Sequence, residues 1–144
     1  MKSVLFVIIT LLAPSIAYAQ DYFGEWIVGT IVHSHISNLS LDEAKTFLGQ
    51  ALLYNKSEVS FGSVTCKNVI FNEALFNERE LYNYHKAFFS DLDIKNGSTV
   101  LNVEITCNDT TWSRFGAFVI HTDSKTFVSY SGHIYALQRK SANW

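Results

Sequence analysis

The stretch "FGAFVIHTDSKTFVSYSGHIYALQRK", residues 115–140, decides how this chain folds. It holds three short runs rich in β-branched and aromatic residues, and only "DSK" and Gly132 separate them. A fourth run, "TVLNVEITC" at residues 99–107, alternates between apolar and polar residues with the period of a strand. Connections this short join neighbouring antiparallel strands. The pattern therefore predicts an antiparallel meander of four strands.

The rest of the chain adds four predicted strands, at residues 22–35, 51–55, 58–61 and 64–71. Two capping boxes, Ser40 with Glu43 and Asn77 with Glu80, predict two short helices, the second running through Phe89. In the second helix, one face carries Leu81, Tyr84, Phe88 and Leu92 at spacings of three and four. Eight short antiparallel strands most naturally close into a barrel, and closure removes exposed strand edges. We therefore expect a mainly β fold, an eight-stranded antiparallel up-and-down barrel with two short helices. A two-sheet sandwich is the alternative arrangement.

Residues 1–19 have the pattern of a signal peptide. Lys2 precedes an apolar run, and Ala17-Tyr18-Ala19 has the small-x-small form that signal peptidase accepts. The apolar run is shorter than the roughly 20 residues of a membrane-spanning helix, although an uncleaved anchor is the alternative. We expect cleavage after Ala19, a single domain at residues 20–144, and a periplasmic or secreted protein without integral membrane association.

The two cysteines, Cys66 and Cys107, both follow the predicted cleavage site. In an exported chain, two cysteines are most simply interpreted as one disulfide bond. Such a bond would close a loop with 40 residues between the two cysteines. The chain-entropy model assigns about 4 kcal/mol of stabilisation to this closure. Two free thiols or a metal site are the alternatives, but two cysteines alone do not complete a zinc site.

Composition and motifs argue against several classes of function. The formal net charge of −2 lacks the basic excess of a nucleic-acid-binding protein. The sequence carries no nucleophile elbow, no zinc-protease helix motif and no P-loop, so we expect no enzymatic activity and no cofactor. His33 and His35 share one face of a strand, but a metal site needs a third and a fourth ligand, and we expect no metal.

The stretch "FGEWIVG", residues 23–29, resembles the Gly-x-Trp start of the lipocalin and calycin barrels. In those families the tryptophan plugs the closed end of the barrel, and the glycine lets the chain cross beneath it. An arginine on the last strand typically packs over the tryptophan. The resemblance implies these structural roles for Gly24, Trp26 and Arg139, and it implies a lipocalin-like barrel. The helices that interrupt the strand order are a departure from true lipocalins.

A second resemblance lies in "SGHIYA", residues 131–136. Its Ser-Gly-x-x-Tyr pattern is similar to the signature of the periplasmic inhibitors of c-type lysozyme, in which this loop enters the lysozyme cleft. The resemblance implies that Ser131, Gly132 and Tyr135 bind a protein partner. The alternative interpretation is an ordinary Ser-Gly hairpin turn, with Tyr135 on the wall of the barrel.

The polar segment "CNDTTWSRFG", residues 107–116, is a further candidate binding surface. It pairs an exposed-looking Trp112 with Arg114, and these two residue types dominate protein interfaces. Trp112 folded back over the barrel mouth is the alternative. The leading hypothesis is an exported inhibitor or immunity-type protein that blocks a cell-wall hydrolase or a toxin through surface loops. A lipocalin-like carrier of a small apolar ligand in the barrel interior is the second hypothesis.

Overall fold

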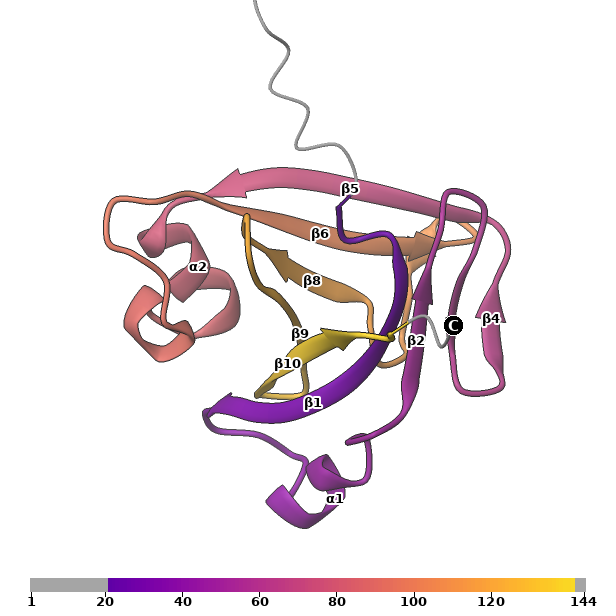
Figure 1. Ribbon diagram of the computed structural model, residues 1–144, viewed down its shortest axis with the longest axis horizontal. Helices are drawn as coiled ribbons and strands as arrows, with labels where there is room; N and C mark the ends of the chain where they lie inside the picture. Colours follow the sequence, from indigo (N-terminus) through magenta and orange to yellow (C-terminus); the bar gives the residue numbers. More distant parts are fainter. Residues whose placement is uncertain (1–20, 142–144) are drawn as a thin grey trace, which may run out of the picture.

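The computed structural model describes residues 21–141, so the predicted signal peptide lies outside the described residues. These residues form one antiparallel sheet of ten strands with the order β4-β3-β2-β1-β10-β9-β8-β6-β5, and β7 pairs with β6 beside this path (Figure 1). The elements are β1 (Gly24–Ser34), α1 (Leu41–Lys45), β2 (Ala51–Tyr54), β3 (Val59–Phe61), β4 (Val64–Cys66), β5 (Val69–Phe76), α2 (Glu78–His85), η1 (Phe89–Leu92), β6 (Val100–Cys107), β7 (Thr110–Thr111), β8 (Phe118–His121), β9 (Thr126–Tyr130) and β10 (His133–Arg139).

The predicted meander is confirmed, because β6, β8, β9 and β10 are consecutive antiparallel neighbours. The mainly β class is confirmed as well. The predicted count of eight strands and the closed barrel are wrong. The run at residues 64–71 is two strands, since the chain bends at Lys67 and Asn68 and crosses from one end of the sheet order to the other. A two-residue strand, β7, is the other addition. The sheet is a curled half-barrel whose end strands, β4 and β5, do not pair.

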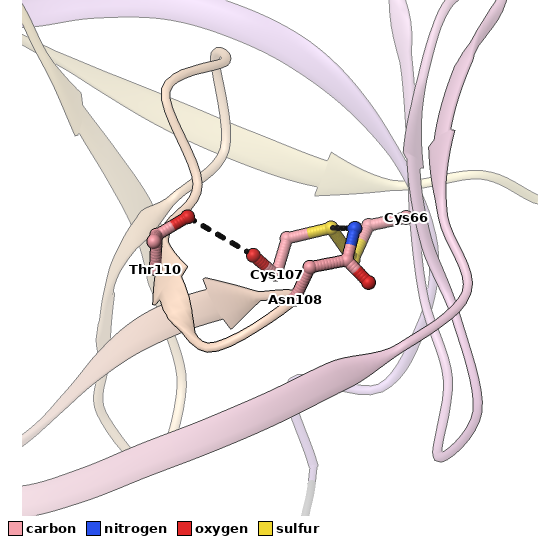
Figure 2. Close-up of a disulfide and its surroundings, with 4 residues drawn as sticks. All are labelled: Cys66, Cys107, Asn108 and Thr110. Carbon is pink, nitrogen blue, oxygen red and sulfur yellow. Dashed lines mark hydrogen bonds between the residues drawn. A yellow bond between two sulfur atoms is a disulfide. The ribbon is translucent and has the colours of Figure 1, made fainter.

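A disulfide bond between Cys66 and Cys107 joins the two ends of this curled sheet (Figure 2). Cys66 ends β4, while Cys107 ends β6 and pairs with Val69 at the start of β5. Thr110 donates its hydroxyl hydrogen to the Cys107 carbonyl oxygen at 3.2 Å, which fixes the chain just after the bond. The predicted disulfide is therefore confirmed, and it links the sheet ends covalently where a strand ladder is missing.

The inside of the curl is filled by side chains from strands that are not neighbours. Tyr54 on β2 donates its hydroxyl hydrogen to the Gly116 carbonyl oxygen at 2.7 Å, although three strands separate β2 from β8 in the sheet. Phe115 packs at the centre, with its ring centroid 4.8 Å from those of Phe47 and Phe61 and 4.9 Å from that of Tyr135. This cross-curl packing makes a dense aromatic core.

The second core lies on the other face of the meander, under α2 and η1. Leu81, Phe89 and Leu92 from these helical segments pack on strand residues that alternate with those of the first core, namely Val100, Ile120, Phe127 and Ile134. Both predicted capping boxes are present, at Ser40 with Glu43 and at Asn77 with Glu80. The second helix ends at His85 instead of Phe89. Lys86 has φ of 57°, a left-handed conformation that stops the helix.

Between Asp21 and Ser141, none of the helices has both the length and the apolar character that a membrane crossing requires.

Candidate binding pocket

The Ser131–Gly132 turn is a two-residue hairpin between β9 and β10. Tyr130 pairs with His133, and both turn residues have positive φ, 46° for Ser131 and 82° for Gly132. This is the backbone of the tight hairpins that match the twist of a sheet. Ser37 donates its hydroxyl hydrogen to the Ser131 carbonyl oxygen. The segment that follows β1 therefore braces the turn and fixes its position.

The segment after β6 is held against the sheet by its backbone and by Glu104. Thr111 donates to one carboxylate oxygen of Glu104 at 2.7 Å, and the Trp112 backbone N–H donates to the Ile105 carbonyl oxygen at 2.9 Å. The side chain of Trp112 is only 7% exposed, so the expectation of an exposed Trp112 is wrong. The side chain folds back onto the protein, while Arg114 is exposed.

The C-terminal end of α2 supplies a third segment. Tyr84 donates its hydroxyl hydrogen to the other Glu104 oxygen at 2.8 Å. His85 donates from Nε2 to the Asn102 side-chain oxygen at 2.6 Å, and burial lowers the pKa of its imidazole. His33 donates from Nε2 to the Lys86 carbonyl oxygen at 3.0 Å. These contacts fix the end of the helix to β6 and β1.

The three segments line one surface pocket of about 610 Å³. Such a volume is within the range of small-molecule binding sites. Aromatic side chains from α2, β8, β9 and the segment after β7 contribute to its walls, and two basic residues, Arg114 and Lys86, are among its lining residues. The lining residues are His35, Tyr84, His85, Lys86, Thr111, Trp112, Ser113, Arg114, Ala117, Phe118, Ser129, Tyr130, Ser131 and Gly132.

The pocket unites four of the five binding residues that the sequence suggested. Trp112 and Arg114 contribute from one segment, and Ser131 and Gly132 from the hairpin. Tyr135 does not take part, because its side chain is fully buried. Its hydroxyl donates to the Ala44 carbonyl oxygen at 3.0 Å, and burial raises the pKa of Tyr135 to about 12. Tyr135 lies on the wall of the interior.

Sequence reasoning missed the residues at the C-terminal end of α2, Tyr84 and the capping residue Lys86 above all. The aromatic spacing of α2 indicated an amphipathic helix, and no signal in the sequence placed the end of that helix beside the hairpin. The hydroxyl of Tyr84 connects the helix end to β6 through Glu104. Its pKa is raised, first by burial and then by the hydrogen bond to Glu104.

The three residues of the lipocalin-like resemblance lie together at the start of β1 and the end of β10. The guanidinium carbon of Arg139 is 4.3 Å from the centroid of the Trp26 ring. Arg139 also donates from Nη1 to the Phe23 carbonyl oxygen at 2.7 Å. Gly24 has φ of 128°, and a Cβ atom there would lie 2.6 Å from Arg139 Nη1. A side chain at position 24 would therefore displace the arginine.

Between residues 21 and 141, no group of three or more histidine, cysteine or acidic side chains is placed to hold a metal ion. His33 and His35 are near one another, with ring centroids 6.4 Å apart. His33 Nδ1 lies 3.7 Å from an Asp91 carboxylate oxygen. These contacts link β1 to the helical segment above the sheet.

Comparisons with known protein families, with curated proteins and with solved structures find no match for this chain.

Proposed function

We propose that this chain is an exported, non-enzymatic binding protein that blocks a protein partner, such as a cell-wall hydrolase or a toxin. The observation that carries the proposal is the convergence of two segments on one pocket. Arg114 and Ser131 come from separate connections in the sheet, yet both line the same concavity. Each segment is held by hydrogen bonds to neighbouring elements, so little conformational entropy is lost when a partner docks.

A surface site agrees better with the packing of the interior than a carrier function does. A carrier needs an empty cavity within the curl, and there the rings of Phe47, Phe61 and Phe115 contact one another. Native cores leave few voids larger than a water molecule. The surface pocket, in contrast, combines apolar walls, positive charges and hydroxyl groups, which is the mixture found at protein interfaces.

Export is part of the same proposal. The disulfide between Cys66 and Cys107 is compatible with an oxidising compartment. Protein isolated from the periplasm or the medium should begin at Gln20. Its intact mass should increase by two hydrogens on reduction. A mature chain that begins at Met1, or two freely alkylated thiols, would contradict export.

The function is tested with hydrolases and toxins encoded beside the gene and with a c-type lysozyme. Excess protein should inhibit at least one of them in an assay of cell-wall lysis or toxin activity. Ser131→Ala and Arg114→Ala should weaken inhibition by roughly thirtyfold or more if these residues are hot spots. Arg79→Ala is the matched control, because Arg79 is exposed on α2 and does not line the pocket. No inhibition, or equal inhibition by all variants, would contradict the proposal.

A further inference from the structure

The charges around the pocket are one-sided. Among the residues that the structure describes, its lining includes Lys86 and Arg114 and no aspartate or glutamate, although the whole chain carries a net charge of −2. The neighbouring carboxylate, Glu104, is half-buried and is not among the lining residues, and its two oxygens accept hydrogen bonds from the hydroxyls of Tyr84 and Thr111. Within residues 21–141, Arg114 forms no ion pair. Its guanidinium group therefore retains its capacity to bind an anion.

The walls of the pocket favour an organic anion over a free inorganic one. Trp112, Phe118 and Tyr130 contribute aromatic surface beside the positive charges. Apolar area of this kind stabilises a ligand only if the ligand has an apolar body to bury. The charged group must then be close to that body.

The geometry of α2 favours a singly charged group over a phosphate. Phosphate sites typically use the N-terminus of a helix, where backbone N–H groups point at the ligand. The pocket instead lies at the C-terminal end of α2, where the helix dipole is negative. The Asn83 carbonyl oxygen accepts a hydrogen bond from Lys86 Nζ, which limits this unfavourable field without reversing it. A guanidinium group matches a carboxylate or a phosphate with two parallel hydrogen bonds, so the smaller charge of the carboxylate makes the distinction here.

We propose that the pocket between α2, the Trp112–Arg114 segment and the Ser131–Gly132 turn binds a carboxylate attached to an aromatic or aliphatic body. Arg114 pairs with the carboxylate, and the aromatic walls cover the body. The carboxylate belongs either to a small metabolite or to the end of a peptide, and the pocket volume accommodates both. This inference rests on the proposed function, because it uses the same pocket as the binding surface. It names the chemical group that a partner would insert there.

The test titrates the mature protein with phenylacetate, N-acetyl-phenylalanine, N-acetyl-phenylalaninamide and inorganic phosphate. Binding is followed by NMR at the indole N–H of Trp112, which Trp112→Phe assigns. Both carboxylates should shift this signal in a saturable manner, and the amide should bind about tenfold more weakly or worse, since a charge-assisted hydrogen bond is lost. The tighter of the two carboxylates identifies the source, a peptide end or a free metabolite.

Two variants separate the inference from its alternatives. Arg114→Gln should weaken binding of both carboxylates by about tenfold or more, and Arg79→Gln should leave it unchanged. If N-acetyl-phenylalanine and its amide bind with equal affinity, the site is only an apolar pocket. If phosphate binds as tightly as the carboxylates, the site binds anions without specificity. If no ligand shifts the Trp112 signal, the pocket is not a binding site for them. Each of these outcomes overturns the inference.

The inference and the proposed function fail separately. If a hydrolase or toxin is inhibited and Ser131→Ala weakens this inhibition, but neither saturating N-acetyl-phenylalanine nor Arg114→Gln alters it, the carboxylate site is wrong and the blocking function stands. If carboxylates bind as expected and no protein is inhibited, the site stands and the blocking function is wrong.

Discussion

The guanidinium carbon of Arg139 lies 4.3 Å from the centroid of the Trp26 ring, so the last strand covers the tryptophan of the first. Trp26 is 5% exposed, and its indole N–H donates to the Tyr22 carbonyl oxygen at 2.8 Å. The contact joins residues that are far apart in sequence but paired in the register of β1 and β10. Stability should therefore depend on both side chains.

Trp26→Ala should lower the free energy of unfolding by about 3–5 kcal/mol, because a large buried aromatic side chain is removed. Arg139→Met keeps most of the side-chain volume but loses the hydrogen bonds of the charged group, at a cost of about 1.5–3 kcal/mol. Urea unfolding followed by circular dichroism measures both. The control is Lys140→Met, whose exposed ion pair with Glu25 contributes at most about 1 kcal/mol. A loss below 1 kcal/mol for Trp26→Ala would contradict its structural role.

The hairpin turn at Gly132 should tolerate a methyl group less well than the turn at Gly97. Gly132 and Gly97 have nearly the same φ, 82° and 79°. A Cβ atom at Gly132 would lie 2.7 Å from Ser37 Cβ, whereas no atom of residues 21–141 lies within 4 Å of one at Gly97. Both alanine variants share the backbone strain of a positive φ. The additional contact should make Gly132→Ala lose roughly 1–3 kcal/mol more of the free energy of unfolding than Gly97→Ala. Equal thermal stabilities of the two variants would mean that the segment after β1 does not brace the turn.

Local sequence patterns predicted the elements better than they predicted how the sheet ends meet. The meander was predictable because its strands are rich in β-branched and aromatic residues and three of them follow one another after short connections. The division at Lys67 was not predictable, since the run from residue 64 to residue 71 reads as one strand, and only tertiary pairing assigns its halves to different neighbours. The early end of α2 depends on a left-handed Lys86, a conformation that the residue type does not indicate.

The candidate site was predictable only in part, for a related reason. Turn chemistry identified Ser131 and Gly132, and interface composition identified Arg114. Helical periodicity placed Tyr84 and Phe88 on one apolar face with Leu81, yet each of these two aromatic side chains is 48% exposed. Periodicity assumes that the helix continues, and α2 ends before Phe88. The position of a helix end on a sheet is a long-range property that no local pattern contains.

Stability should fall as the pH falls from 7 to 5. Burial lowers the pKa of His85 and of His121 below the ordinary value of about 6.5. The unfolded chain then binds more protons than the folded protein as the pH drops below about 6.5, which favours unfolding. Hydrogen bonds lower the pKa values of Asp93 and Glu43. The stabilisation that these carboxylates contribute is therefore lost only in more acidic solution, where they become protonated.

His85→Gln and His121→Gln should each reduce the pH dependence between pH 7 and pH 5, because glutamine does not titrate there. The measurement is the urea unfolding free energy at half-unit pH steps, and the slopes are compared with that of the wild type. A wild-type profile that is flat over this range, or that rises towards pH 5, would contradict the neutral state of the buried imidazoles.

The interior of the curl should take up no apolar ligand until a ring is removed from it. Phe115 is 1% exposed, and its ring is packed against those of Phe47, Phe61 and Tyr135. Phe115→Ala should lower the free energy of unfolding by about 3–5 kcal/mol and leave a cavity lined by apolar side chains. Cavities of this kind stay dry and bind benzene. Calorimetry should detect benzene binding to the variant and none to the wild type. Fatty-acid probes should not enter the interior of either protein, so Arg114→Gln should weaken any binding of these probes at the surface pocket. Saturable uptake of a fatty acid by the wild-type protein, unaffected by Arg114→Gln, would instead locate the function in the interior, because the surface pocket would then have no part in it.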